Sequence, residues 1–386
     1  MNKKNFIPLS VPNIGDLEKK YLSECINSNW ISTKGPLVKK FEEKFSNLIK
    51  SRFSIATNSG TAALHLALLS LDIGNDDIVL VPDLTFISPV NVIKYVGAEP
   101  ILIDADKETW QIDSKLIKKF LESECLLKKS KLIHKRSNKK IKAILVVHIL
   151  GYPSNIKMIK TLAKKFNLPI IEDVAETLGA KINGKYIGND GVLSCYSFNG
   201  NKIITTGGGG MVTSQDYKLI KKINHISNQS KLCQIDNTHD DIGYNYKMTA
   251  IQASLGIAQL KKLNKFLAIK RVIAKNYDLG LQDLSYIKTI KFNQNTLPSH
   301  WLYSISFNLS KTKYSLKKII SIFKDNNIEV RRLWEPMHLS KVHKDCLFYG
   351  TGISKLLYEC SISLPCSTNM NSKDQKRIIK ILRELD

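Results

Sequence analysis

Short, continuously apolar runs alternate with helical patterns in the first half of the chain, and this alternation limits the fold more than any other feature. The apolar runs are rich in Ile and Val and occupy residues 78–82, 100–104, 143–147 and 169–174. Helical patterns alternate with them, at residues 61–71 before the first run and at 86–96 and 155–167 between later ones. Strands that alternate with helices predict an α/β fold with a mostly parallel sheet covered on both faces. Such sheets bind ligands at the carboxyl ends of their strands.

Helical patterns also stand at both ends of this region. Two amphipathic helices precede it, the first with Asn13 as its N-cap, and their apolar stripes are Ile14, Leu17, Tyr21 and Cys25, then Val38, Phe41, Phe45 and Leu48 or Ile49. A long helix is predicted over 246–285, then a strand at 300–309, a helix near 315–327 and a last helix from about Ser372. A chain of 386 residues exceeds one ordinary core. We therefore predict a large domain over 1–255 and a smaller α+β domain over 256–386.

The formal net charge of +24 raises the alternative of a nucleic-acid-binding protein. Only seven of the 58 basic residues are arginine, and the lysines are spread along the whole chain. The densest basic run, 128–142, lacks the interleaved aromatic residues that stack on bases. We therefore predict a solvated insertion or a hairpin at 128–142, and neither nucleic acid nor a membrane as a partner.

Seven scattered cysteines contain no C-x-x-C pair and no His/Cys cluster at metal-ligand spacing. This pattern is typical of reduced thiols in a cytosolic protein, and it predicts no metal site. The first ten residues carry positive charge without the apolar segment of a secretory signal. No apolar run approaches the roughly 20 residues that span a bilayer. The expected location is the cytoplasm.

Two stretches have the composition of ligand sites. Asn58-Ser59-Gly60-Thr61 leads directly into a helical pattern, where free N–H groups and the helix dipole favour an anion. An ordinary N-cap is the alternative. Asp173 ends an apolar strand, where its carboxylate could bind a metal, a ribose or a protonated ring nitrogen, or could cap a helix.

The stretch SFNGNKIITTGGGG, residues 197–210, places one lysine before four glycines. It is not a Walker A loop, because Lys202 follows Asn201 and Ile203 occupies the Ser/Thr position. It is not a dinucleotide-binding loop, because the glycines lead into the strand pattern MVTS rather than a helix. IITT is also predicted as strand. Lys202 is therefore a candidate Schiff-base nucleophile on a turn between strands, with an ordinary surface lysine as the alternative.

A helix N-terminus for a phosphate, a strand-end aspartate and a lysine are together what pyridoxal 5′-phosphate (PLP) requires. The segments SGTAALHLAL, PDLTF, EDVAETLGA, SFNGNKIITTGGGGMV and GYNYKMTAIQASLGIAQL occur in the order that resembles the DegT-type sugar-nucleotide aminotransferases. The resemblance covers nearly the whole chain. It implies a fold-type I PLP enzyme, whose large domain has a mostly parallel seven-stranded sheet flanked by helices.

The resemblance also implies roles for residues around the cofactor. Lys202 would bind the cofactor covalently and then move a proton between the substrate carbon and the cofactor. Asp173 would pair with the pyridine nitrogen, since an opposite charge favours the protonated ring. Glu176 would lie near the 3′-oxygen, and Phe86 would stack on the ring.

The same resemblance implies phosphate contacts from Gly60, Thr61 and Ser197. Asn245 would reach the phosphate bound by a neighbouring subunit, which implies a homodimer with shared sites. Some relatives have histidine in place of the lysine and carry out dehydration. A PLP-dependent sugar-nucleotide dehydratase is therefore an alternative, which the presence of Lys202 disfavours.

The implied substrates are L-glutamate and a nucleotide-linked 4-keto-6-deoxyhexose, as in nonulosonic-acid and perosamine-type pathways. Residues near the sugar nucleotide would be Trp30, Ser32, Thr33, Arg331 and His338. The segment IEVRRLWEPMH departs from the family pattern, because Arg332 replaces the usual proline.

Overall fold

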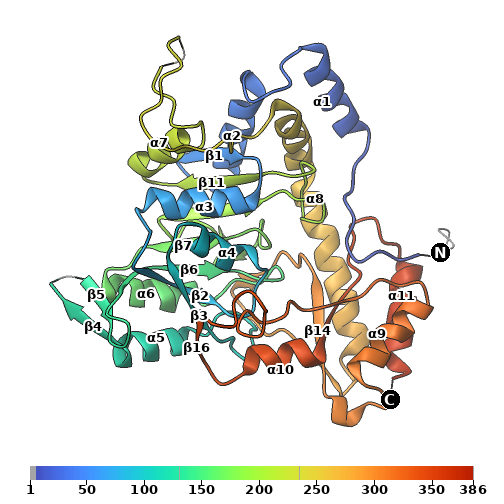
Figure 1. The fold of residues 1–386 in the computed structure, drawn as a ribbon. Coiled ribbons are helices and arrows are strands. Elements are labelled where there is room, and N and C mark those ends of the chain that lie inside the picture. The colour runs from blue at the N-terminus through green and yellow to red at the C-terminus, as the bar shows by residue number, and fades with distance from the viewer. Residues whose placement is uncertain (1–5, 130, 234, 386) are drawn as a thin grey trace.

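A large mixed sheet forms the centre of the molecule (Figure 1). The computed structural model describes residues 6–129, 131–233 and 235–385. The strands of the large sheet within these residues are β1 (Phe53–Thr57), β2 (Asp77–Pro82), β3 (Glu99–Ile103), β4 (Cys125–Lys128), β5 (Lys131–His134), β6 (Lys140–Val147), β7 (Ile170–Asp173), β10 (Leu193–Ser197), β11 (Gly210–Ser214) and β16 (Leu347–Tyr349). They follow the order β1-β11-β10-β7-β6-β2-β3-β16, with β4 and β5 attached beside β6.

The pairings from β10 to β16 along this order are parallel, as predicted, whereas β11 is antiparallel to both β1 and β10. The predicted number of seven strands was wrong for the described residues, because the sheet has ten. The hairpin β4–β5 and the short strand β16 extend the seven-stranded arrangement. β16 comes from the C-terminal part of the chain and pairs Leu347 with Ile101 of β3, a contact that no local pattern indicates.

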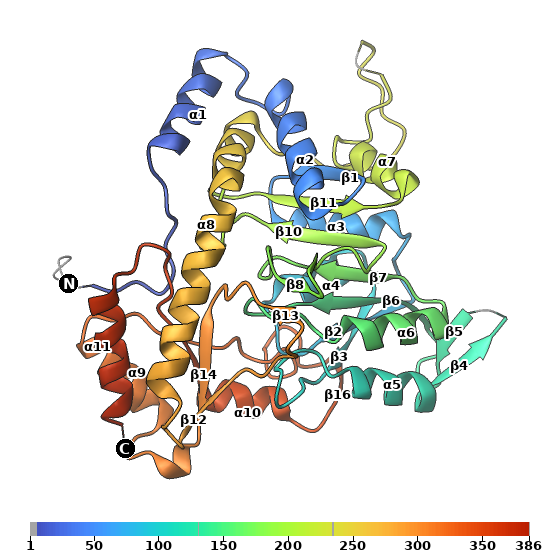
Figure 2. The same cartoon turned by 180° about the vertical axis from the view of Figure 1, so that it is seen from behind.

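Helices cover both faces of the sheet (Figures 1 and 2). Those of the first part of the chain are α1 (Asp16–Asn27), α2 (Pro36–Ile49), α3 (Gly60–Ser70), α4 (Ser88–Tyr95), α5 (Ser114–Ser123), α6 (Ile156–Phe166) and α7 (Tyr217–Ile226). Alternate side chains of a strand point to opposite faces. Ile78 and Leu80 of β2 therefore pack with α5 and α6, whereas Val79 and Val81 pack with the apolar cluster that includes α3 and α4.

The long helix α8 (Ala250–Leu281) runs beside the large sheet, from α1 and α2 at one end to α11 at the other (Figure 2). The remaining helices of the described residues are α9 (Leu316–Asp325), α10 (Ile353–Cys360), α11 (Ser372–Arg383) and the 3-10 turn η2 (Leu309–Lys311). Thr249 caps α8 by accepting a hydrogen bond from the Gln252 N–H. The predicted domain boundary at residue 255 falls inside α8 and stays a prediction.

Two small sheets complete the fold. The first has the antiparallel order β12-β14-β17-β15, formed by β12 (Ile287–Thr289), β14 (Tyr303–Phe307), β17 (Ser361–Leu364) and β15 (Arg331–Arg332). The second consists of β13 (Thr296–Leu297), β8 (Lys181–Ile182) and β9 (Lys185–Tyr186). Within the described part of the chain, no helix is both long enough and apolar enough to cross a membrane.

Two local predictions near the N-terminus and the glycine run were wrong. The N-cap of α1 is Gly15 rather than Asn13, and the Glu18 side chain accepts a hydrogen bond from the Gly15 N–H. Glu18 is buried, and it also accepts a hydrogen bond from Gln259 and pairs with Lys262 of α8. Residues 203–206 are not a strand; the Thr206 N–H bonds to the Phe198 carbonyl and folds them into a compact turn.

The basic run 128–142 contains part of the predicted hairpin, whose strands β4 and β5 pair Lys128 with Lys131. Residue 130 of this run lies outside the described residues. Residues 1–5, which belong to the N-terminal segment discussed for a secretory signal, also lie outside them.

Candidate active site

The carboxyl ends of the central strands meet around a cavity of about 330 Å³. β7 ends at Asp173, β10 ends at Ser197, and these two strands are parallel neighbours with Cys195 opposite Asp173. Eight of the predicted site residues line this cavity: Gly60, Thr61, Phe86, Asp173, Glu176, Ser197, Lys202 and Arg331. The structure therefore brings segments separated by as many as 271 positions to one site.

Lys202 lies on the turn between β10 and β11, and its amine points into a largely buried environment. The side chain is 13% exposed, and Nζ lies 3.6 Å from Oε1 of Glu176. Nζ also lies 3.9 Å from the ring centroid of Trp301. The backbone N–H of Lys202 donates to the carbonyl of Asn199, which fixes the turn. Lys202 is therefore no ordinary surface lysine.

The four glycines after Lys202 provide backbone geometry. Gly209 has φ +138°, which side chains with a Cβ rarely adopt, and it lines the cavity together with Gly208. A Cβ on Gly210 would overlap the carbonyl group of Ser59, immediately before α3. The glycines thus let the start of β11 pass directly against the N-terminal turn of α3.

Asp173 places a buried carboxylate at the end of β7. Oδ1 accepts a hydrogen bond of 2.9 Å from the Ala175 N–H, and no other hydrogen bond to the carboxylate is formed within the described residues. Burial raises the pKa of Asp173, while the Ala175 N–H and the nearby Lys202 charge oppose this rise. A cationic partner in the cavity would favour the ionised carboxylate.

Glu176 is buried beside Lys202 and contacts the neighbouring loop. Its Oε2 accepts a hydrogen bond of 2.8 Å from the Leu150 N–H. Burial raises the pKa of Glu176 to about 7, although the Lys202 charge lowers it. The side chain can therefore hold or release a proton near neutral pH.

The opposite end of the cavity is formed by the N-terminus of α3. Ser59 caps this helix by accepting a hydrogen bond from the Ala62 N–H, so the first N–H groups of the helix, at Gly60 and Thr61, precede the intrahelical ladder. Thr61 donates its hydroxyl to Ser88. The Thr85 hydroxyl also lines the cavity, and it is buried without a hydrogen-bond partner among the described residues. These groups suit an anion.

Five of the predicted residues are not among those that line this cavity. Trp30 is 50% exposed, and the Ser32 carbonyl accepts a hydrogen bond from the Ala250 N–H. His338 instead pairs with Asp83 at 2.7 Å, between Nδ1 and Oδ2, and stacks on Phe348. The others are Thr33, which is exposed, and Asn245, whose carbonyl accepts a hydrogen bond from the Asn58 side chain. Their roles stay predictions.

Sequence reasoning missed several residues of the cavity. Trp301 and Leu150 line it but stand next to no quoted motif, and Trp334 lines it although it lies within the segment IEVRRLWEPMH, where it was given no role. Thr85 could have been found, because it precedes Phe86 in the segment PDLTF.

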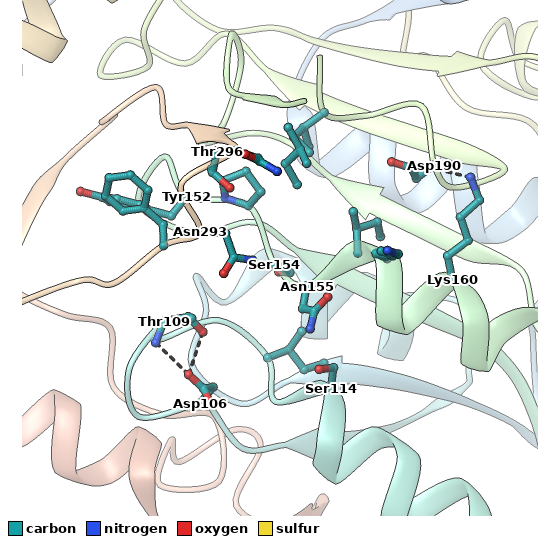
Figure 3. Close-up of a pocket in the computed structure, with 18 of the residues that line it drawn as sticks. Asp106, Thr109, Ser114, Tyr152, Ser154, Asn155, Lys160, Asp190, Asn293 and Thr296 are labelled. Carbon is teal, nitrogen blue, oxygen red and sulfur yellow. Dashed lines mark hydrogen bonds and ion pairs between the residues drawn. The ribbon is translucent and has the colours of Figure 1, made fainter. Parts of the chain in front are cut away.

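A second cavity, of about 860 Å³, lies near the N-termini of α5 and α6 and contains none of the predicted site residues (Figure 3). Two pairs of its polar side chains bond to each other. Lys160 pairs with Asp190 at 2.7 Å, and Asp106 accepts hydrogen bonds from Thr109. Asn155 caps α6. We place the chemistry in the smaller cavity, where the Lys202 amine, the Asp173 carboxylate and the partnerless Thr85 hydroxyl lie together.

Comparison with known proteins identifies the family of the chain. The model of the DegT/DnrJ/EryC1/StrS aminotransferase family matches residues 12–383. The chain belongs to this family. It is therefore a PLP-dependent aminotransferase of fold type I.

Individual relatives of this aminotransferase extend over most of its length. It is 38% identical to the GDP-perosamine synthase of Escherichia coli O157:H7 over 340 residues, which cover 88% of each chain. It is 34% identical to the GDP-perosamine synthase of Vibrio cholerae, with 86% of each chain covered. The solved structure of Helicobacter pylori PseC shares the fold, with a TM-score of 0.88, 23% identity, and coverage of 98% of this chain and 99% of PseC.

The residues of the smaller cavity fit PLP. Three groups of the cavity match the three reactive parts of PLP. The Lys202 amine would bind the aldehyde, the Asp173 carboxylate would pair with the ring nitrogen, and the first N–H groups of α3 would bind the phosphate. The partnerless Thr85 hydroxyl adds a further donor in the same cavity. When bound, PLP supplies an aromatic ring that accepts electrons from the bonds of an attached amine.

Proposed function

We propose that this aminotransferase moves an amino group from L-glutamate to the C4 ketone of a nucleotide-linked 4-keto-6-deoxyhexose. The product would be a 4-amino-4,6-dideoxy sugar nucleotide for surface glycan or nonulosonic-acid biosynthesis. The observation that carries the proposal is the Lys202 amine, which lies in one cavity with Asp173 and the N-terminus of α3. The 38% identity to an enzyme named GDP-perosamine synthase supports the sugar substrate.

In this proposal, the chain's own residues divide the work. Lys202 holds the cofactor and, once released, carries a proton to or from the reacting carbon. Asp173 keeps the ring nitrogen protonated through its negative charge. Glu176, 3.6 Å from the Lys202 amine, holds a proton beside it near neutral pH. Phe86 lies at the cavity wall with its ring 52% exposed, where it can stack on the cofactor.

Binding of the anionic groups involves two ends of the cavity. Gly60, Thr61 and Ser197 would hold the cofactor phosphate at the start of α3. Arg331 and Arg332 line the other side, and Arg331 also pairs with Glu329 at 3.0 Å. Guanidinium groups there suit the carboxylates of glutamate or the phosphates of the sugar nucleotide.

We also propose that the enzyme acts as a homodimer in the cytoplasm. Asn245 does not line the cavity of its own chain, which is consistent with a role in the site of a partner subunit. Trp30, Ser32 and Thr33 are exposed and would meet the sugar in such an assembly. The large domain would comprise residues 1–255 and the small domain residues 256–386.

The test is a screen of nucleotide-linked 4-keto sugars with PLP and L-glutamate, with the products identified by mass spectrometry. We expect a product in which an amino group replaces the keto oxygen. The purified protein should be yellow, and borohydride should fix the cofactor to Lys202. Colourless protein that takes up no added PLP would contradict the proposal.

A dehydratase on the same fold is the second candidate, and the same screen distinguishes it. A deoxygenated sugar in place of an aminated one would support this alternative. The amine of Lys202 favours transamination, because the relatives that dehydrate have histidine at that position.

A further inference from the structure

Trp301 contacts the Lys202 segment in two independent ways. The face of its indole ring lies 3.9 Å from Nζ of Lys202, measured to the ring centroid. The edge of the ring donates a hydrogen bond of 2.7 Å from Nε1 to the carbonyl of Asn201, the residue before Lys202. One side chain thus holds both the amine and the backbone of this lysine.

The position of Trp301 is itself fixed by neighbours. The residue is 4% exposed, and its ring stacks on Trp334 with an interplanar angle of 9°. Its carbonyl accepts hydrogen bonds of 2.8 Å from the Lys270 amine and 3.2 Å from the Cys366 thiol. Such anchoring keeps the ring from rotating away from Lys202.

Lys270 is an unusual anchor, because its side chain is buried in α8. The residue is 3% exposed, and its amine donates to the carbonyls of Trp301 and Cys366. No carboxylate among the described residues forms an ion pair with it. A buried amine without a counter-charge is costly and is retained where it holds particular groups in place.

We propose that Trp301 is a positioning residue for Lys202, whose ring face stabilises the charged amine and whose ring edge fixes the backbone of the lysine turn. A cation over an aromatic face is attracted by the ring quadrupole, and the attraction is larger when water is excluded. The ring therefore holds the Lys202 amine at one position in the cavity. The inference rests on the proposed role of Lys202 as the reacting amine.

The test measures the amine directly in the full-length protein after the cofactor has been removed with hydroxylamine. At one fixed pH, trace acetic anhydride labels an amine more slowly when a ring covers it, so the labelling rate of Lys202 reports the contact with the Trp301 ring. Exposed Lys185, in the same digest, is the internal reference. Because no cofactor or substrate takes part, a failed screen for sugar amination and a failed labelling experiment are distinguishable results.

Two substitutions separate the face from the edge. Trp301→Leu removes both contacts, and we expect Lys202 to be labelled about tenfold faster relative to Lys185, since a desolvated cation–π contact of this kind is worth about a tenfold change. Trp301→Phe keeps an aromatic face but removes the Nε1 donor. We expect its labelling rate to stay close to that of the wild type, while amide hydrogen exchange in residues 199–203 becomes about fivefold faster.

These outcomes decide the proposal. A Trp301→Leu protein that melts cooperatively but labels Lys202 at the wild-type rate would overturn the role of the ring face. Unchanged hydrogen exchange in Trp301→Phe would overturn the role of the ring edge. If Trp301→Leu does not fold, Trp301→Phe still tests the proposal. Wild-type hydrogen exchange at residues 199–203 in Trp301→Phe would show that the ring edge does not fix the backbone around Lys202.

Discussion

Nζ of Lys202 lies 3.6 Å from Oε1 of Glu176, and both side chains are largely buried at the carboxyl end of the central sheet. The pair joins the turn after β10 to the segment after β7. Because the two groups share one cavity with Asp173, the Lys202 charge lowers the pKa of both carboxyl groups and opposes the effect of burial. Four predictions follow from this arrangement and from the packing that supports it.

Replacing Lys202 with Ala should remove the reacting amine. We expect the rate of amino transfer to fall by about a thousandfold or more, since a positioned acid–base group contributes about 10²–10⁴-fold and covalent attachment is lost as well. Borohydride should no longer fix the cofactor to the chain. Lys185→Ala is the matched control, because this exposed lysine lies in the other cavity. Trapping of the cofactor on another lysine in Lys202→Ala would contradict the assignment.

Replacing Asp173 with Asn should keep the hydrogen bond from the Ala175 N–H but remove the negative charge. We expect kcat/KM to fall by about 100-fold, in the range seen when one electrostatic group of an active site is removed. Steady-state kinetics with L-glutamate would measure the effect. Asp190→Asn, which breaks an exposed pair with Lys160, should retain the wild-type rate. Equal rates in Asp173→Asn and the wild type would exclude the proposed charge pairing.

The raised pKa of Glu176 predicts that the stability of the cofactor-free protein depends on pH. Burial raises its pKa from 4.5 to about 7, so the folded chain binds this proton more tightly than the unfolded chain. Its contribution to stability is therefore full below pH 4.5 and is lost as the pH rises towards 7. Glu176→Gln cannot titrate there. Urea unfolding measures the free energy of unfolding of both proteins. Between pH 4.5 and 8, the value for Glu176→Gln should rise by up to about 3 kcal/mol relative to that of the wild type.

Parallel pH profiles of unfolding for the two proteins would contradict this prediction. Glu172→Gln is unsuitable as a control, because Glu172 accepts several buried hydrogen bonds. Glu122→Gln is suitable, because that side chain forms an exposed pair with Lys165.

Gly256 should tolerate no side chain, because it lies against Phe41 where α2 crosses α8. A Cβ at Gly256 would lie 2.6 Å from the Phe41 ring, which is fully buried. We expect Gly256→Ala to lower the free energy of unfolding by about 1–3 kcal/mol through overpacking. Gly74→Ala is the control, since its Cβ would meet only the Val96 carbonyl, at 3.7 Å. A Gly256→Ala protein with wild-type stability in urea would contradict this prediction and would show that the α2–α8 interface can accommodate a methyl group.

Much of the element pattern follows from local sequence. The apolar runs at 78–82, 100–104 and 143–147 lie in β2, β3 and β6, and the helical patterns that alternate with the runs lie in α3, α4 and α6. The errors have tertiary causes. Ile203 and Ile204 are buried in the turn after β10, so their apolar side chains reflect burial and do not indicate a strand.

For the candidate site, local motifs indicated Lys202, Asp173 and the start of α3, because each has a recognisable chemical context in the chain. Trp301 had no such context. It stands 99 positions after Lys202, and its relevance depends on contacts made through α8 and β14. Glu176 was expected beside the cofactor, but its proximity to the Lys202 amine comes from the pairing of β7 with β10.

The sequence by itself determined the parallel α/β architecture, the position of the lysine turn and the residue types of a PLP site. These follow from apolar periodicity, glycine geometry and the chemistry of a few side chains, all of which act over short stretches. The tertiary structure alone decided that β16 extends the sheet and that Lys270 anchors Trp301 beside Lys202. The physical reason is burial, because removing these groups from water fixes partners that lie far apart in the chain.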